Sequence, residues 1–190
     1  MESKTVYESF DEMQLGDNLL RGIYAYGFEK PSPIQSKAIV KLIKGGDLIA
    51  QAQSGTGKTA TFTIAMLQKI NPGIRETQAL VMAHTRELAT QIADVVGKIG
   101  DRMNIKIVTC IGGKAVRNNI EDLKGKPQIV VGTPGRVKDM INRKFLDVSK
   151  IIFFCIDEAD EMLSFGFKDQ VYDVFKFLPE QTQIAIFSAT

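Results

Sequence analysis

The sequence predicts an α/β fold built on an open, mainly parallel β-sheet that is flanked by helices on both faces. Short apolar runs alternate along the chain with segments whose apolar residues recur at helical spacing. This alternation is typical of a parallel sheet, because its central strands are buried on both faces and therefore appear as continuous apolar runs. The 190 residues, of which 44% are hydrophobic, suffice for one domain with a sizeable core.

The strands are expected at apolar runs separated by helices. In chain order, these runs are residues 47–52, 79–83, 106–111, 128–132, 151–156 and 183–187. In parallel sheets of this kind, ligands bind in the crevice outside the carboxyl ends of the strands. The loops that follow these runs are therefore where functional residues are expected.

Three helices have clear start signals. Ser32 as N-cap and Pro33 in the first turn begin one helix, which Gly45 and Gly46 should end. Thr85 should cap a second, and Thr133 with Pro134 should begin a third. The expected apolar faces are Ile34, Ala38, Ile39, Leu42 and Ile43 in the first; Leu88, Ile92, Val95, Val96 and Ile99 in the second; and Val137, Met140 and Ile141 in the third.

Composition and chain ends limit the class of protein. The net charge of +2 arises from dispersed charges, so any nucleic-acid contact should be local. Cys110 and Cys155 lie in apolar runs without partner motifs and are expected to be reduced and buried. With no membrane-length apolar stretch, we expect a soluble intracellular protein. Residues 1–9 should form a flexible tail and residues 10–190 one domain, which ends without a closing helix and is therefore expected to be part of a longer protein.

Residues 52–59 (AQSGTGKT) indicate a phosphate-binding loop. Its glycines let successive backbone N–H groups surround phosphate oxygens, and the positive end of the following helix points at them. Lys58 would reach the β and γ phosphates of a nucleotide, and the Thr59 hydroxyl would bind Mg²⁺. The usual first Gly is replaced by Ala52, and the alternative is an ordinary Gly-rich turn.

The acidic residues after the apolar run 151–156 complete the expected catalytic site. Asp157 would hold Mg²⁺, through water, and Glu158 would orient and deprotonate the attacking water. The alternative is an acidic helix N-terminus favoured by the helix dipole. The pairing of these carboxylates with the Gly-rich loop favours a nucleotide triphosphate site.

These motifs resemble those of the DEAD-box RNA helicases. Residues 157–160 (DEAD), 188–190 (SAT) and 28–35 (FEKPSPIQ, with Phe10 upstream) are similar to three motifs of the family in the same order. The resemblance covers residues 10–190 and implies the first of two RecA-like domains. Residues 19–28 and 160–164 are most similar to the members that act in translation initiation.

The resemblance implies how the base and the RNA are held. Phe28 would stack on adenine and Gln35 would hydrogen-bond its edge, although alone they would suggest a core aromatic and a polar helix face. Ser54, Gly55, Thr56 and Gly57 complete the ATP site. The RNA-contacting residues implied by the resemblance, which grip the backbone without reading sequence, are Thr85, Arg86, Gly112, Gly113, Thr133, Pro134, Gly135 and Arg136.

The resemblance also implies residues that couple hydrolysis to RNA unwinding and a second domain that this chain does not contain. Ser188 and Thr190 would bond to the Asp160 region and link hydrolysis to strand separation. A C-terminal RecA-like domain, absent from this chain, would supply arginine fingers, so the isolated chain should turn over ATP very slowly. The implied setting is a cytoplasmic monomer acting on mRNA with translation initiation scaffold proteins.

One residue departs from the family pattern. His84 stands where the family usually has Pro, and it is the only histidine. We expect a tolerated loop substitution rather than a new contact. A single His also excludes a His-rich metal site and, with no GxSxG motif, a Ser-His-Asp hydrolase.

The sequence therefore predicts the ATP-binding domain of an ATP-dependent RNA helicase that couples hydrolysis to local unwinding. An ATP-gated RNA clamp that serves as a scaffold is an alternative that the motifs do not separate. An NTPase acting on a substrate other than nucleic acid is disfavoured by Arg86 and Arg136.

Overall fold

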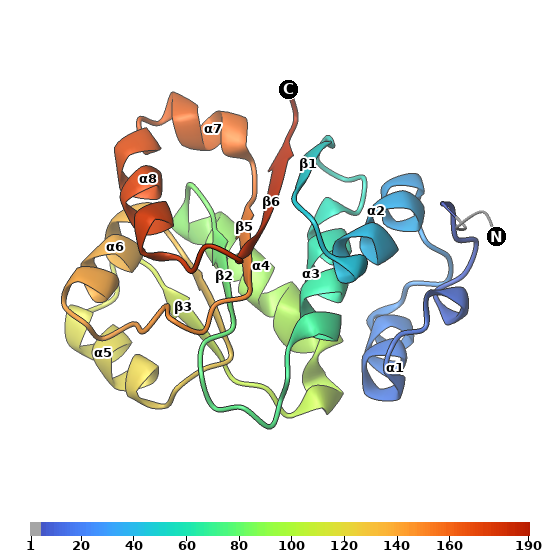
Figure 1. The fold of residues 1–190 in the computed structure, drawn as a ribbon, viewed down its shortest axis with the longest axis horizontal. Coiled ribbons are helices and arrows are strands. Elements are labelled where there is room, and N and C mark those ends of the chain that lie inside the picture. Colours follow the sequence, from blue (N-terminus) through green and yellow to red (C-terminus); the bar gives the residue numbers. More distant parts are fainter. Residues whose placement is uncertain (1–4) are drawn as a thin grey trace.

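The computed structural model describes residues 5–190 and has the predicted architecture (Figure 1). All the strands pair in parallel, in the order β1-β6-β5-β2-β4-β3. The six expected apolar runs are confirmed as strands, most of them shorter at their ends. The strands are β1 (Leu48–Gln51), β2 (Ala79–Met82), β3 (Ile107–Cys110), β4 (Ile129–Gly132), β5 (Phe153–Ile156) and β6 (Gln183–Ser188).

Helices connect the strands and cover the sheet. The two short 3₁₀ helices are η1 (Asp11–Met13) and η2 (Asp101–Met103). The α-helices are α1 (Asp17–Tyr26), α2 (Pro33–Lys44), α3 (Lys58–Lys69), α4 (Arg86–Ile99), α5 (Val116–Lys124), α6 (Pro134–Asn142), α7 (Ala159–Ser164) and α8 (Lys168–Phe177).

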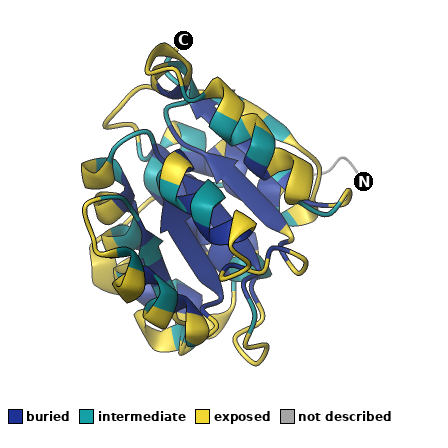
Figure 2. Ribbon diagram, turned by 90° about the vertical axis from the view of Figure 1, so that its left-hand side faces the viewer, coloured by how far each residue is buried: buried dark blue, intermediate teal, exposed yellow. Residues whose placement is uncertain are grey.

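The core consists of two apolar layers, one on each face of the sheet. In one layer, the four helices from α1 through α4 pack on strand residues that include Val81, Cys155 and Phe187. In the other layer, the four helices from α5 through α8 pack on strand residues that include Leu80 and Phe154. Neighbouring strand residues enter opposite layers because successive side chains point to opposite faces. Figure 2 shows the resulting arrangement, with buried strands between helices whose outer faces are exposed.

All three helices begin where the sequence predicted, and the two predicted side-chain caps are present. Ser32 caps α2 with a complete capping box, in which its Oγ accepts from the Gln35 N–H and the Gln35 side chain accepts from the Ser32 N–H. Thr85 Oγ1 accepts from the Leu88 N–H at 3.0 Å and caps α4. Thr133 has the extended backbone of an N-cap, but its side chain makes no capping hydrogen bond. The third helix therefore begins at Pro134 without a side-chain cap.

The apolar face of α4 is rotated slightly from the predicted one. Its buried residues are Ala89, Ile92, Val96 and Ile99, whereas Leu88 and Val95 are only half-buried. Ala89 was missed because a small residue contributes little to the apolar periodicity.

Part of the expected flexible tail is attached to the domain. The backbone N–H of Tyr7 donates to the Ser36 Oγ at 3.0 Å, and the Ser36 hydroxyl donates back to the Tyr7 carbonyl. Residues 1–4 of the expected tail lie outside the described residues. The chain is thus anchored on α2 before the buried Phe10 enters the core.

Candidate functional site

The Gly-rich loop connects the carboxyl end of β1 to the first turn of α3. Gly55 and Gly57 have φ values of 82° and 88°, in the left-handed region that favours glycine. The Thr56 hydroxyl donates to the Gln53 carbonyl at 2.7 Å, and the Thr56 carbonyl accepts from the Ser32 hydroxyl at 2.9 Å. The loop is therefore stabilised both by its own threonine and by the N-cap of α2, while Ser54 stays exposed.

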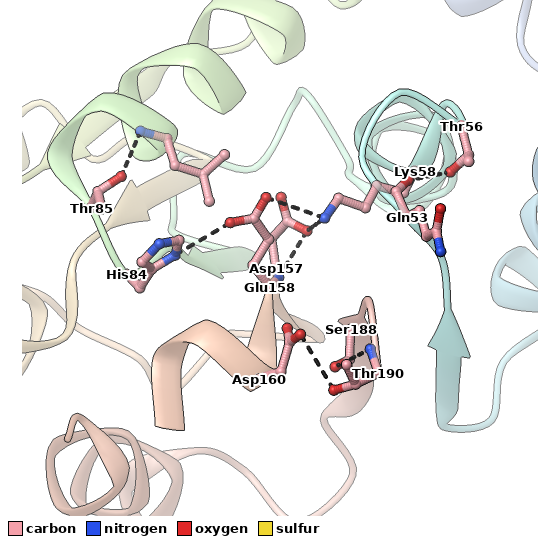
Figure 3. A network of polar contacts seen from close by, with 11 residues as sticks. Gln53, Thr56, Lys58, His84, Thr85, Asp157, Glu158, Asp160, Ser188 and Thr190 are labelled. Carbon is pink, nitrogen blue, oxygen red and sulfur yellow. Dashed lines mark hydrogen bonds and ion pairs between the residues drawn. The ribbon is translucent and has the colours of Figure 1, made fainter. Parts of the chain in front are cut away.

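Lys58, the first residue of α3, extends to the carboxyl end of β5 (Figure 3). Its Nζ lies 3.2 Å from Asp157 Oδ1 and 3.4 Å from Glu158 Oε1. The Lys58 side chain is only 7% exposed and that of Asp157 is fully buried. The ammonium group that was predicted to bind phosphate is thus neutralised here by the two predicted catalytic carboxylates.

The two carboxylate oxygens of Asp157 differ, because one has polar partners and the other has none. Burial raises the pKa of its carboxyl, and the Lys58 ammonium opposes part of that rise. Oδ1 accepts from the Glu158 N–H at 3.0 Å, whereas the buried Oδ2 has no hydrogen-bond partner. A buried acceptor without a partner is costly unless a ligand completes it.

The uncommitted oxygen fits the predicted role of Asp157 toward Mg²⁺. Within residues 5–190, no group of three or more His, Cys, Asp and Glu side chains is placed to hold a metal. Mg²⁺ does not require such a group, because it usually keeps several waters and binds through one or two carboxylates together with phosphates. Asp157, with Thr59 on the first turn of α3, therefore fits a magnesium nucleotide.

Glu158 occupies a strained position at the N-cap of α7. Its φ of 50° lies in the left-handed region, which costs a residue with a side chain about 1 to 3 kcal/mol. Its two carboxylate oxygens face different partners, with Oε1 toward Lys58 and Oε2 toward His84. The turn thus directs the Glu158 carboxylate to the space between β2 and α3.

His84 makes contacts that were not expected for a tolerated loop substitution. Its Nδ1 lies 3.5 Å from Glu158 Oε2, and its ring stacks on Phe165 with centroids 5.2 Å apart. The sequence shows only an unusual residue in place of Pro. The contact depends on the pairing of β2 with β5, which brings residues 84 and 158 to the same sheet edge.

The predicted adenine-binding residues are engaged with the protein. The Gln35 side chain is 1% exposed; its Oε1 accepts from the Ser32 N–H, and its Nε2 donates to the Gly57 carbonyl at 3.2 Å. Phe28 is half-buried and stacks on Tyr26 with a centroid distance of 5.1 Å. Gln35 therefore contacts the phosphate-binding loop directly, and its amide would have to exchange one of these bonds to reach a base.

An open groove lies beside this site at the same edge of the sheet. It is lined by six of the predicted RNA-contacting residues, namely Thr85, Arg86, Gly112, Thr133, Gly135 and Arg136, and also by His84. Two predicted residues do not line it. Pro134 is buried in the first turn of α6, and Gly113 lies under the Arg86 side chain.

The glycine pair makes room for Arg86. A Cβ atom on Gly113 would lie 2.4 Å from Arg86 Nη1, and Gly113 has a φ of 83°. A Cβ atom on Gly112 would lie 3.5 Å from Arg86 Nη2, an ordinary contact. The space beside this pair is therefore occupied by the guanidinium of Arg86, and its positive φ and shorter contact make Gly113 the less replaceable of the two.

Arg136 is held by a second set of hydrogen bonds. Its Nη1 donates to Asn119 Oδ1 at 2.7 Å, and its Nη2 donates to the Lys114 carbonyl at 3.0 Å. Asn119 is fully buried, and its Nδ2 donates to the Thr109 carbonyl. Sequence analysis missed Asn119. The signal was a polar residue on the inner face of an amphipathic helix, next to Val116, Ile120 and Leu123.

The predicted coupling residues meet near the C-terminal end of β6. Thr190 Oγ1 donates to Asp160 Oδ2 at 3.3 Å, and the Thr190 N–H donates to the Ser188 Oγ (Figure 3). Desolvation acts to raise the pKa of Asp160, but hydrogen bonds from the Glu161 N–H and the Ser188 hydroxyl outweigh it and lower that pKa. The three residues therefore form one polar cluster at the start of α7.

Comparison with known proteins identifies relatives over most of the chain. The family model described as DEAD/DEAH box helicase matches residues 32–190. The ATP-dependent RNA helicase eIF4A of Neurospora crassa is 61% identical over 183 residues, which are 96% of this chain and 46% of that protein. The eIF4A of Mycosarcoma maydis is 59% identical over 187 residues, 98% of this chain and 46% of that protein. The chain spans about half the length of these curated relatives.

Solved structures of related proteins have the same fold. A DEAD box protein from Methanococcus jannaschii superposes with a TM-score of 0.93 at 41% identity, covering 97% of this chain and 51% of that one. Saccharomyces cerevisiae Dbp5 bound to RNA and ADP BeF3 gives a TM-score of 0.87 at 41% identity, covering 97% of this chain and 47% of that one.

Within residues 5–190, no helix has the length and apolar character needed to cross a membrane.

Proposed function

Because the chain belongs to the DEAD/DEAH box helicase family, we propose that it is the ATP-binding N-terminal RecA-like domain of an ATP-dependent RNA helicase. The observation that carries this proposal is the position of Lys58 beside both Asp157 and Glu158, next to the groove lined by Arg86 and Arg136. Phosphate-binding and carboxylate groups thus adjoin a groove that offers two arginines, with Glu87 and Asp139 also in its lining, as suits an RNA-stimulated ATPase.

Nucleotide binding would exchange partners around Lys58. Phosphate oxygens would replace the carboxylates as acceptors for its Nζ, which lies within 3.4 Å of both. Asp157 and Glu158 would then be released for their own roles. The backbone N–H groups of the loop that contains Ser54, Gly55, Thr56 and Gly57 would surround the phosphates.

Hydrolysis would depend on the two carboxylates acting differently. Thr59 and, through water, Asp157 would hold Mg²⁺, which would supply charge neutralisation at the phosphates. Glu158 would accept a proton from the attacking water, since its carboxylate is held beside the phosphate-binding lysine. Phe28 and Gln35 would hold adenine, once the Gln35 amide exchanges one of its present bonds.

RNA would bind in the groove through its backbone. Arg86 and Arg136, with the N-termini of α4 and α6, would present donors to phosphate and sugar oxygens, contacts that carry no sequence information. The solved structure of Dbp5 with RNA and ADP BeF3 supports this proposal. Asp160, Ser188 and Thr190 would couple hydrolysis to strand separation.

A second RecA-like domain would complete the enzyme. It would close over ATP and RNA and supply arginine fingers, which contribute about 10³ to 10⁵ in rate in related phosphoryl transfers. The present chain alone should therefore hydrolyse ATP very slowly. By similarity to eIF4A, we propose a cytoplasmic monomer that unwinds mRNA locally during translation initiation, together with scaffold proteins of that process.

Steady-state ATP hydrolysis tests this function. The complete protein is compared with its Glu158→Gln variant, with and without unstructured RNA. We expect strong RNA stimulation and a loss of about 10²-fold or more in the variant, because the amide cannot accept the proton. ATP affinity, measured with a fluorescent analogue, should be retained.

Two outcomes would contradict the proposal. An RNA-independent rate would point to an NTPase with another substrate, and full activity of Glu158→Gln would exclude the proposed role of that carboxylate. Slow turnover with long ATP-dependent retention on RNA would favour the clamp function over unwinding.

A further inference from the structure

We propose that His84 is a positioning residue that holds the Glu158 carboxylate in place for hydrolysis, an inference that rests on the proposed ATPase function. His84 Nδ1 lies 3.5 Å from Glu158 Oε2. The other oxygen of the same carboxylate lies 3.4 Å from Lys58 Nζ. The Glu158 carboxylate therefore lies between two nitrogen-bearing side chains, Lys58 at the start of α3 and His84 in the segment after β2 (Figure 3).

The His84 nitrogen is available for this role. The His84 side chain is only 10% exposed, and Nδ1 has no hydrogen-bond partner. At 3.5 Å, the present contact with Glu158 is longer than a good hydrogen bond. A shift of a few tenths of an ångström in either side chain would complete a bond that satisfies a nearly buried polar atom.

Two further contacts restrict where the imidazole can lie. Its ring stacks on Phe165 at an interplanar angle of 27°. Its backbone lies between the buried Ala83 and Thr85, which caps α4. The stack on Phe165, the residue that follows α7, and the short backbone link to the capped start of α4 limit where the ring can lie, and Nδ1 faces Glu158 Oε2.

The contact matters most when Lys58 leaves. In the proposed mechanism, Lys58 Nζ turns from Glu158 to the phosphates, and Glu158 loses its partner at Oε1. His84 would then be the remaining nitrogen donor that keeps the carboxylate aimed at the water. A Pro at this position, as is usual in the family, has neither a side-chain nitrogen nor a ring that can hydrogen-bond Glu158.

His84 also connects the hydrolytic residue to the RNA groove. It lines the groove together with Thr85 and Arg86, which follow it directly in the chain. RNA that binds Arg86 would pull on the same backbone segment that carries the imidazole. The positioning effect is therefore expected to be larger in RNA-stimulated hydrolysis than in basal hydrolysis.

The test compares three variants of the complete protein. His84→Phe retains an aromatic ring against Phe165 but lacks the nitrogen, His84→Asn retains a donor at the place of Nδ1, and His84→Pro installs the usual family residue. We expect His84→Phe and His84→Pro to lower the RNA-stimulated kcat about fivefold to tenfold, as expected for loss of one hydrogen bond of ordinary strength. His84→Asn should recover most of it. The KM for ATP and the affinity for RNA should change less than twofold.

The outcomes separate this role from the alternatives. An RNA-stimulated kcat within twofold of the parent in His84→Phe, or the same loss in His84→Asn as in His84→Phe, would overturn the proposal. A loss of RNA affinity at unchanged kcat would make His84 an RNA contact and would also overturn it. Thermal melting of each variant identifies losses caused by misfolding, and His84→Asn then decides the role on its own.

Failure of the proposed function would be distinguishable. It would appear as absence of RNA stimulation in the unaltered protein, before any variant is considered. The same variants would then be compared in basal hydrolysis, where a loss in His84→Phe that His84→Asn restores would still support positioning and an unchanged rate would refute it.

Discussion

At the nucleotide site, the nearly buried Lys58 is neutralised by Asp157 and Glu158, whereas in the neighbouring groove Arg86 and Arg136 rest against glycines, a carbonyl and an amide. Within residues 5–190, no carboxylate forms an ion pair with either arginine. The first site therefore balances its charge through direct ion pairs. In the second, Glu87 and Asp139 also line the groove but leave both guanidinium groups without an ion-pair partner. The first site suits a nucleotide whose phosphates must displace the carboxylates from Lys58. The groove suits RNA, whose backbone is attracted electrostatically to the arginines.

The largest effect is expected from breaking the balanced charges. Lys58→Ala leaves the fully buried Asp157 and its neighbour Glu158 without a cation, and breaking a buried pair in this way costs about 3 kcal/mol or more. We expect the free energy of unfolding at pH 7, measured with urea, to fall by about that amount. Lys98→Ala, which breaks an exposed pair with Asp94, is the matched control and should change it by less than about 1 kcal/mol.

The same variant has a predictable pH dependence. Burial already raises the pKa of Asp157, and removal of Lys58 takes away the charge that opposes this rise. As pH falls, Asp157 therefore takes up a proton in the folded state more readily than in the unfolded state, so the destabilisation should shrink between pH 7 and pH 5. A destabilisation that stays constant or grows on acidification would show that Asp157 is not the group left unbalanced.

A moderate effect on RNA affinity is expected when the glycine beneath the Arg86 guanidinium is replaced. Gly113→Ala forces a side chain into a φ of 83° and places its Cβ against the Arg86 guanidinium, which must move. RNA affinity, measured by fluorescence anisotropy at constant salt, should fall about tenfold, equivalent to about 1.4 kcal/mol. Gly112→Ala, with an ordinary contact distance of 3.5 Å, should lose less than about twofold.

The two alanine variants together show what the glycine pair contributes to RNA binding. Equal losses in both alanine variants would mean that RNA itself approaches the glycine backbone, as the sequence first suggested. Unchanged affinity in Gly113→Ala would mean that the position of Arg86 does not govern binding in the groove.

The smallest difference between the two sites is expected in the core beneath them, where each has one buried cysteine. Cys155 lies on β5 under the nucleotide site and Cys110 on β3 under the groove, and both are buried. Burial raises the pKa of Cys110 to about 12 and that of Cys155 well above its ordinary value, so neither thiol ionises near pH 8. Both should resist a thiol-specific disulfide reagent in the folded protein and react fully in urea. Rapid reaction of one cysteine alone would show that the core opens under that site.

Much of the fold was predictable because local patterns and the global structure agree. Continuous apolar runs predicted every strand, and Ser32, Pro33 and Gly45 predicted the limits of α2. Thr133 and Pro134 also mark the start of α6 as predicted, although the Thr133 hydroxyl makes no capping bond. An N-cap residue type can therefore indicate where a helix begins without showing how its side chain is used.

The candidate site was predictable in its membership but not in its contacts. Lys58 and Asp157 are 99 positions apart, and their motifs indicated a shared site before any geometry was available. The bonds from Gln35 to Gly57 and from Arg136 to Asn119, and the contact between His84 and Glu158, depend on which strands are neighbours. No local pattern encodes the neighbours of a strand.

The sequence by itself determined the α/β class, the strands, the Gly-rich loop and the family, because each of these is expressed in residues close together in the chain. Only the tertiary structure decided that Lys58 is neutralised by both carboxylates, that Arg86 fills the space left by Gly113, and that His84 faces Glu158. These contacts arise because the strand order β1-β6-β5-β2-β4-β3, with all strands parallel, brings the loops after β1, β2, β3 and β5 to one edge of the sheet. Charge balance and packing at that edge are properties of the assembled sheet, so they could be found only there.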